Sequence, residues 1–147
     1  MESKKVYLVQ ADTTVGFSSS DDEKLSNIKQ RPTTQKMLQT VDCFSTLLKS
    51  TRVPKKFRRK VRLSKRTTFI YPNQKSFRVI DRNDRFYYFI KKFKSLYSTS
   101  ANLTGNHFDE EFALRNCDIV VLTKDGFSEK ISSSIYKLNK NQIKKIR

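Results

Sequence analysis

The segment Tyr97-Ser98-Thr99-Ser100-Ala101-Asn102-Leu103-Thr104-Gly105 carries the most information about the fold of this chain. Seven of its residues, from Ser98 to Gly105 without Leu103, are small or bear hydroxyl or amide groups. Ser, Thr and Asn among them can turn the backbone, cap a helix or present polar groups to an anion. An aromatic and basic stretch, Phe86 to Lys94, precedes it with apolar residues at helical spacing. We therefore expect a helix, a short strand over 96–98 and then a polar loop. An ordinary polar turn is the alternative for this loop.

Composition indicates one compact domain with anionic partners. The chain has 147 residues, enough for a single domain with its own core. Hydrophobic residues make up 36% and charged residues 31%, and the formal net charge is +17. Such a charge favours nucleotides, polyphosphates or nucleic acids as partners and leaves the fold undetermined. We predict one domain over residues 1–147.

Cysteine and histidine are too scarce for a disulfide framework or a zinc site. Cys43 and Cys117 lie far apart in the sequence, and His107 is the only histidine. The N-terminus lacks the apolar core of a signal peptide, and no stretch approaches the roughly 18 to 20 apolar residues that a membrane span requires. These features predict a soluble cytoplasmic protein with no membrane partner.

Helical and strand patterns alternate along the chain. A capping box, Ser20 to Glu23, predicts a helix that reaches Lys29 and ends before Pro32. Further helices are expected over 44–48, from Pro54 onward with Phe57, Val61 and Leu63 on its buried face, over 86–93 and over 110–114. Strands are expected over 4–9, 37–41, 69–71, 77–80, 96–98, 118–122, 131–138 and 143–146, with residues 11–16 as a polar loop. The interleaving predicts an α/β (α+β) fold around one twisted mixed sheet.

The segment from Lys49 to Arg66 contains ten Lys or Arg residues and no acidic residue. A helix with charge on several sides neutralises phosphates and makes nucleic-acid binding strongly salt-dependent. A solvated helix face explains the same pattern equally well. Phe57 is the only aromatic residue in the run, so no platform for stacked bases is indicated.

The sequence offers scattered cations and hydroxyls, and we find no nucleophile paired with a base. His107 has no neighbouring carboxylate and nucleophile and is read as a loop residue. No Gly-Lys-Ser or Gly-Lys-Thr phosphate-binding loop is present. This composition suits a site that holds anionic reactants side by side, where positioning and electrostatics supply the rate enhancement.

Two motifs together resemble the signature of the YrdC-type threonylcarbamoyl-AMP synthases, which carry a Lys-x-Arg pair followed by a Ser-x-Asn pair. Here the pairs are Lys29-Gln30-Arg31, followed by Pro32, and Ser100-Ala101-Asn102. Weaker similarities follow in the order that the family shows: Gln10 to Phe17, Thr67 to Pro72, Phe77-Arg78-Val79, Ser133-Ser134-Ile135 and Ile146-Arg147.

The resemblance implies a YrdC-like fold with an open cationic cavity and a nucleotidyltransferase activity. Such an enzyme joins L-threonine, bicarbonate and ATP into threonylcarbamoyl-AMP and releases pyrophosphate. Mg²⁺ would accompany the triphosphate, held mainly by phosphate oxygens and water, with no metal ligands from the protein. A separate transferase then carries the threonylcarbamoyl group to tRNA.

The resemblance also implies which residues bind each substrate. Arg78 would pair with the threonine carboxylate through both sides of its planar fork. Thr13 and Ser133 would contact the threonine amine or hydroxyl, and Ser98 would contribute through its backbone. No side chain is expected to act as a nucleophile or base. The ATP site would comprise Lys29, Arg31, Ser100, Asn102 and Arg147.

Departures from the family pattern leave a second hypothesis open. Gln10-Ala11 replaces Pro-Thr, Val15 replaces an aromatic residue, and Thr40 stands where a histidine is expected. These changes fall mainly on the threonine side of the site. The alternative is a non-catalytic relative of the same fold that binds tRNA or double-stranded RNA through its cations. A plain basic ribosomal or chaperone-type protein would leave the ordered motifs unexplained.

Overall fold

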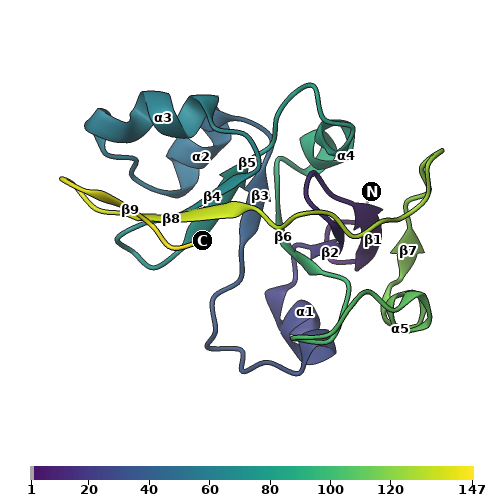
Figure 1. Ribbon diagram of the computed structural model, residues 1–147. Helices are drawn as coiled ribbons and strands as arrows, with labels where there is room; N and C mark the ends of the chain where they lie inside the picture. Colours follow the sequence, from purple (N-terminus) through teal and green to yellow (C-terminus); the bar gives the residue numbers. More distant parts are fainter. Residues whose placement is uncertain (1) are drawn as a thin grey trace.

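The computed structural model describes residues 2–147 (Figure 1). Its strands are β1 (Tyr7–Gln10), β2 (Val15–Ser19), β3 (Gln39–Val41), β4 (Thr67–Ile70), β5 (Ser76–Val79), β6 (Ser95–Ser100), β7 (Ile119–Val120), β8 (Ser134–Leu138) and β9 (Ile143–Lys145). Its helices are α1 (Asp22–Lys29), α2 (Phe44–Ser50), the short 3-10 helix η1 (Lys55–Phe57), α3 (Arg58–Leu63), α4 (Phe86–Phe93) and α5 (Glu110–Asn116).

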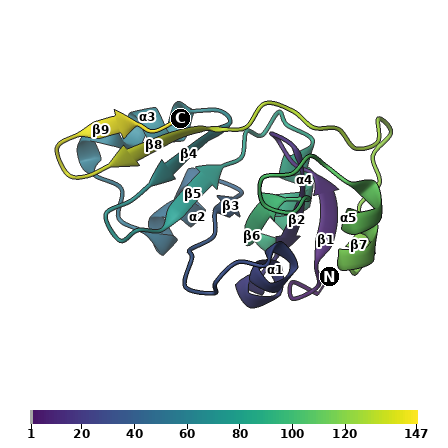
Figure 2. The ribbon, with the colours of Figure 1, turned by 60° about the horizontal axis from the view of Figure 1, so that its bottom comes forward.

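All nine strands found in residues 2–147 join one sheet in the order β7-β1-β2-β6-β3-β5-β4-β8-β9 (Figure 2). The pairs β1–β7, β3–β5 and β4–β8 are parallel, and the other pairs are antiparallel. The sheet is therefore mixed. This confirms the predicted α/β single domain.

The β1 strand is buried on both of its faces. Val6 and Leu8 pack in one cluster with Leu25 of α1 and Ala113 of α5. Tyr7 and Val9 point the other way, into a cluster formed with α4. Successive side chains of a strand alternate between the two faces of the sheet, so a strand with apolar residues on both sides requires cover on both.

A third core cluster supports the other half of the sheet. Leu47 of α2 and Val61 of α3 pack against Phe69 of β4 and Phe77 of β5, and Leu138 of β8 closes the cluster. In Figure 1, α2, α3 and α4 lie above the sheet, whereas α1 and α5 lie below it. The faces of β4 and β5 opposite Phe69 and Phe77 remain available for a site.

The β2 strand was not expected from the sequence. Val15 and Gly16 were assigned to a polar loop, but they open a strand that is buried along its whole length. Apolar and polar residues do not alternate in its sequence, Val-Gly-Phe-Ser-Ser, and both faces are covered, so periodicity carries no signal. Similarly, Thr99 and Ser100 were expected in a loop and instead extend β6, because they pair with Phe17 and Gly16 of β2.

Two smaller expectations about helices were wrong. The N-cap of α1 is Asp21 rather than Ser20: the Asp21 carboxylate accepts the Lys24 backbone N–H at 3.1 Å, and the Ser20 hydroxyl contacts Ser3 instead. A carboxylate there adds a favourable interaction with the helix dipole. Leu63, expected on the buried face of its helix, is 62% exposed because α3 ends there, shortly after the buried Val61.

Candidate functional site

A cavity of about 260 Å³ lies where the two halves of the sheet meet. Its walls come from the β1–β2 loop, the strands β4, β5 and β6, and the segment leading into β8. Six of the residues predicted to bind substrates line it: Thr13, Arg78, Ser98, Ser100, Ser133 and Arg147. The structure therefore brings together side chains from positions 13 to 147 of the chain.

Arg78 is the most deeply buried cation of this cavity. It lies on β5 between Phe77 and Val79, which face the core, so alternation turns its side chain to the opposite face. Arg78 Nη2 lies 2.9 Å from Asp12 Oδ1, and the two side chains are 5% and 2% exposed. Apart from this ion pair, the Asp12 carboxylate and Arg78 Nε have no hydrogen-bond partner among residues 2–147.

The environment of Asp12 shifts its protonation. Burial raises the pKa of the Asp12 carboxyl, and the positive charge of Arg78 opposes this effect without cancelling it. The pKa of Asp12 is therefore raised overall. Removal of the carboxylate from water destabilises its charged form by more than the interaction with Arg78 stabilises it. Arg78 thus already faces one carboxylate, and its buried Nε–H has no hydrogen-bond partner within residues 2–147.

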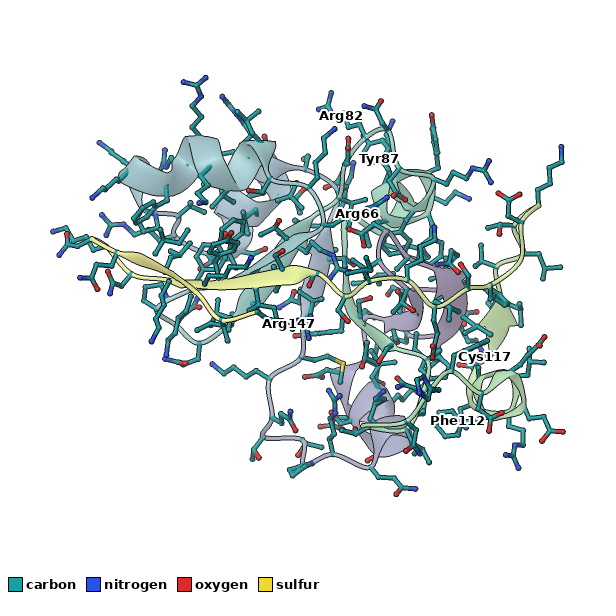
Figure 3. All side chains as sticks on the ribbon, viewed as in Figure 1. Arg66, Arg82, Tyr87, Phe112, Cys117 and Arg147 are labelled. Atoms are coloured by element: carbon teal, nitrogen blue, oxygen red, sulfur yellow. The ribbon has the colours of Figure 1, made fainter. Side chains whose placement is uncertain are left out.

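Arg78 also belongs to a chain of hydroxyl groups. Its Nη1 donates to Thr68 Oγ1 at 3.4 Å, and Thr68 Oγ1 lies 2.9 Å from the Ser133 hydroxyl. Arg147 Nε and Nη2 donate to the Ser133 carbonyl at 3.1 and 2.9 Å. Figure 3 places the Arg147 side chain beside β8, near the middle of the molecule. These contacts fix the region around Ser133 against β4.

Lys29, at the last turn of α1, is buried against the polar segment that follows Ser100. Its Nζ donates to the Ser100 carbonyl at 2.9 Å and to Asn102 Oδ1 at 3.0 Å, and it also contacts the Asn102 carbonyl. Burial, followed by the charge of Arg31, lowers the pKa of Lys29 to about 8. A buried ammonium surrounded only by neutral oxygens keeps its proton less firmly than one in water.

The remaining predicted positions differ in how they relate to the cavity. Lys29 and Asn102 do not line it; both contact Ser100, which does. Arg31 lies outside it, where its Nε donates to Thr104 Oγ1 at 3.2 Å. Ser98, which was expected to contribute through its backbone, lines the cavity, and its backbone N–H donates to the Leu38 carbonyl at 2.9 Å.

Sequence reasoning assigned no role to several residues of the site. Asp12 was recognised in a motif without a task, yet it is the ion-pair partner of Arg78. Thr68 links Arg78 to Ser133 and was also missed. A signal was present in the second case, because Thr68 precedes Phe69 on a strand, and the side chain next to a core residue faces the opposite side. The ion pair joins residues distant in the chain and leaves no local pattern.

The site presents cations, hydroxyls and amides rather than a nucleophile with a base. In residues 2–147, no group of three or more His, Cys, Asp and Glu residues is placed to hold a metal ion. His107 is an exposed loop residue beside Glu129, away from the cavity lining. Cations, hydroxyls and amides placed around one cavity can orient anions and stabilise charge that develops on them.

The fold is similar to that of several solved structures. P. abyssi Sua5 complexed with L-threonine superposes with a TM-score of 0.78 at 12% identity, covering 98% of this chain and 50% of the Sua5 chain. E. coli YciO gives a TM-score of 0.75 at 16% identity, with 98% of this chain and 82% of YciO covered. Full-length HypF in its phosphate- and nucleotide-bound form gives 0.72 at 18% identity, with 98% and 27% covered.

No protein-family model and no curated protein sequence matches this chain. The structural similarities define the class of fold, which is the one shared by Sua5 and YciO and expected from the YrdC-type motifs. The chain spans about half of Sua5 and about a quarter of HypF. Within residues 2–147, the helices are all too short or too polar to cross a membrane.

Proposed function

We propose that this protein is an L-threonylcarbamoyladenylate synthase, a nucleotidyltransferase that uses L-threonine, bicarbonate and ATP. The observation that carries the proposal is the shared cavity: residues assigned to both substrates from sequence motifs line one space of about 260 Å³. The fold supports it, since Sua5 has a similar structure in complex with L-threonine and HypF in a nucleotide-bound form.

The proposed reaction begins with threonine and bicarbonate. The threonine nitrogen attacks the bicarbonate carbon, and loss of water leaves a carbamate. A carbamate oxygen then forms a bond to the α-phosphorus of ATP, while the bond from that phosphorus to the bridging oxygen of pyrophosphate breaks. Negative charge accumulates on the phosphates during this step, so nearby cations stabilise the transition state.

The threonine half of the proposed site centres on Arg78. Arg78 lines the cavity while Asp12 neutralises its guanidinium at Nη2, and in this proposal the guanidinium also pairs with the threonine carboxylate. Thr13, Ser98 and Ser133 supply polar groups on the walls of the same cavity for the amine and hydroxyl of threonine. Asp12 therefore acts as a positioning residue for Arg78 in this proposal.

In the proposed ATP half, Ser100 and Arg147 line the cavity. Lys29 and Asn102 contact Ser100 from behind, and Arg31 lies outside the cavity beside Thr104. Lys29 brings positive charge to Ser100 from a buried position. Mg²⁺ would travel with the triphosphate, bound to phosphate oxygens and water. A transferase would consume the adenylate and modify tRNA in the cytoplasm.

The test is direct detection of the adenylate. Purified protein is incubated with ATP, Mg²⁺, labelled bicarbonate and L-threonine, and the labelled product and pyrophosphate are measured. We expect product that depends on threonine, a strong loss of product in Arg78→Met and Ser100→Ala, and little change in the exposed-site control Lys92→Gln. Pyrophosphate release that is equally fast without threonine would contradict the proposal.

A further inference from the structure

The two edges of the sheet differ in their side chains. At one edge lies β9, which carries the exposed lysines Lys144 and Lys145. Lys137 of β8 lies directly opposite Lys144, so positive charge is concentrated along this edge. Lysines on an edge strand are a usual means by which proteins prevent a further strand from pairing with a sheet. The β9 edge is therefore protected.

The opposite edge, formed by β7, carries no such protection. In Figures 1 and 2, β7 lies at one end of the sheet, and no other strand of residues 2–147 lies beyond it. The sequence from Ile119 to Leu122 is Ile-Val-Val-Leu, without a charged residue or a proline. A continuous apolar run is typical of a strand inside a sheet. Here, however, Ile119 is 39% exposed and Leu122 is 81% exposed.

The backbone of this edge has polar groups that face away from the sheet. Ile119 and Val121 donate their N–H groups to carbonyls of the segment 6–8, at 3.1 and 2.8 Å. Successive residues of a strand direct their backbone groups to opposite sides, so the N–H and C=O groups of Val120 and Leu122 face outward. An edge with open backbone groups and apolar side chains is a template for another strand.

The side chains of the edge are suited to a strand that is apolar on both faces. Val121 packs with the core cluster of α4, so alternation turns Val120 and Leu122 to the face that α5 covers. On that second face, Leu114 of α5 is also 47% exposed. A strand added at this edge therefore meets apolar groups on both faces, and β7 itself has the matching composition.

The net charge of this protein lies toward the other end of the sheet. Residues 43–80 and 130–147 contain 18 of the 31 Lys and Arg residues and none of the 14 acidic residues. They contribute β5, β4, β8 and β9, the four strands farthest from β7. The rest of the chain therefore carries 13 basic and 14 acidic residues and is close to neutral. Two copies that meet at β7 keep their positive halves apart, whereas contact through β9 would bring like charges together.

We infer that the β7 edge binds the same edge of a second copy of this chain, so that the two sheets join across a twofold axis. Antiparallel pairing centred on Val121 places Val120 of each copy opposite Leu122 of the other, and these residues have the outward backbone groups. The same register brings Asp118 of each copy toward Lys124 of the other. The edge thus complements itself in shape and charge, as a twofold interface requires.

The experiment measures the oligomeric state of the full chain. Analytical ultracentrifugation is run from about 1 to about 200 μM protein in about 0.15 M NaCl, where screening reduces repulsion between the positive halves. We expect a monomer–dimer equilibrium with a Kd of about 1–100 μM, since a short strand pair buries less surface than a permanent dimer does.

Two variants change the edge in different ways. Val120→Pro removes an N–H that faces away from β1, so it should block the dimer and leave the β1–β7 pair intact. Leu122→Lys places like charges near the twofold axis and should raise the Kd at least about tenfold. The matched control is Ile146→Lys, which adds the same charge beside β9, where Ile146 is 53% exposed. The control should keep the wild-type Kd.

A disulfide tests the register. In a background with Cys43→Ser and Cys117→Ser, Val121→Cys places two thiols opposite each other across the axis. The two Cα atoms of such a pair lie about 4.5 Å apart, which suits a disulfide. Mild oxidation should link the Val121→Cys variant into dimers, and the control Ile146→Cys in the same background should remain largely unlinked.

A wild type that stays monomeric at every concentration would overturn the inference, and so would equal Kd values for Leu122→Lys and Ile146→Lys. A Val120→Pro variant that has the wild-type circular dichroism spectrum and still dimerises would have the same effect. Assemblies larger than dimers would indicate a different contact, since a twofold interface closes at two copies. The inference does not depend on the proposed function, because residues 119–122 do not line the substrate cavity. Failure of the adenylate assay would leave the ultracentrifugation result standing.

Discussion

Lys29 shows how one side chain links a helix to the cavity wall, through Ser100. Its side chain is buried, and its ammonium group bonds to neutral oxygens of Ser100 and Asn102. These bonds hold the chain where β6 ends, so Lys29 both positions Ser100 and places a charge behind it. Because burial lowers the pKa of Lys29 to about 8, that charge is sensitive to pH in an accessible range.

We therefore predict that ATP affinity falls as the pH rises above about 8. An anion favours the protonated lysine, so loss of the proton weakens binding by up to about tenfold per pH unit. The measurement is the Kd for ATP from about pH 7 to about pH 9.5 by calorimetry. Lys29→Arg stays protonated throughout this range and should flatten the profile. An unchanged pH profile in the arginine variant would contradict a role for the Lys29 charge.

The buried Arg78–Asp12 pair predicts strong coupling in stability. Arg78→Met leaves a buried carboxylate without its partner, which typically costs about 3–5 kcal/mol in the free energy of unfolding. Asp12→Leu/Arg78→Met removes both charges and should cost less than Arg78→Met alone. Urea denaturation of the wild type, the two single variants and the double variant at neutral pH measures the coupling energy.

The control pair is Lys94 and Asp42, whose charged atoms lie 3.7 Å apart with the lysine side chain 67% exposed. Solvent screens such a pair, so its coupling should stay below about 1 kcal/mol. Additive losses at Arg78 and Asp12 would show that the two charges do not stabilise each other.

Six residues that the sequence motifs selected line the cavity, but the motifs do not show how these residues contact one another. Motif order was sufficient to select Thr13, Arg78, Ser100, Ser133 and Arg147, and all five line the same space. The same motifs also selected Arg31, which follows the left-handed Gln30 at the end of α1, does not line the cavity and donates to Thr104 instead. Neither motifs nor periodicity reveals a partner such as Asp12, because tertiary pairing depends on how strands distant in sequence are arranged in the sheet.

Helix α1 gives a test of how a helix start is chosen. The structure assigns the N-cap to Asp21, although Ser20 matches the Ser-x-x-Glu capping pattern. We predict that Asp21→Ala lowers the free energy of unfolding by about 0.5–2 kcal/mol, because it removes the acceptor for the Lys24 N–H. Ser20→Ala, its matched control, should stay within about 0.5 kcal/mol of the wild type. A larger loss in Ser20→Ala, measured by urea denaturation, would restore the pattern-based assignment.

The β2–β6 pair depends on a glycine at position 16. A Cβ atom there would lie 2.6 Å from the Thr99 carbonyl oxygen, which is closer than such atoms approach. We predict that Gly16→Ala destabilises the protein by about 1–3 kcal/mol, since the backbone of β6 must move. Ser18→Ala is the control on the same strand, because its buried hydroxyl has no hydrogen-bond partner in residues 2–147. Thermal unfolding should separate the two variants, and a similar Tm for both would show that the strands can move apart at little cost.

Helices and strands with a clear apolar periodicity could be predicted from the sequence. Short strands that are buried on both faces could not. The α4 helix was expected from the spacing of Phe86, Phe89, Ile90 and Phe93, and the structure confirms it over Phe86–Phe93. Strands were also expected over 69–71 and 77–80, and β4 and β5 form there as an antiparallel pair. In contrast, β2 was missed because Gly16 and two serines lie in a buried strand, where neighbours rather than propensity decide the conformation.

The charge distribution predicts how the whole molecule responds to salt. Lys and Arg residues without acidic partners repel one another within the half formed by residues 43–80 and 130–147. Raising NaCl from about 0.01 M to about 0.15 M shortens the screening length from about 30 Å to about 8 Å and weakens this repulsion. We predict a higher Tm at the higher salt concentration, by about 2–4 °C for each kcal/mol of repulsion removed.

Two triple charge variants provide the comparison for this effect. Lys49→Gln/Lys55→Gln/Arg59→Gln should show a smaller rise in Tm with salt than Lys92→Gln/Lys124→Gln/Arg115→Gln, although their net charges are equal. Differential scanning calorimetry measures both. Equal salt responses would mean that the repulsion is spread over the molecule rather than concentrated in one half.

The parallel pairing of β8 with β4 has a consequence for biosynthesis. The edge of β4 is covered only by residues 134–138, and Ser133 and Arg147 complete the cavity wall. A nascent polypeptide therefore exposes the open edge of β4 while it is still being translated, and open strand edges promote aggregation. The lysines and arginines that precede β4 would keep neighbouring nascent chains apart by repulsion. The wall of the cavity that contains Ser133 and Arg147 can form only after both residues have been synthesised.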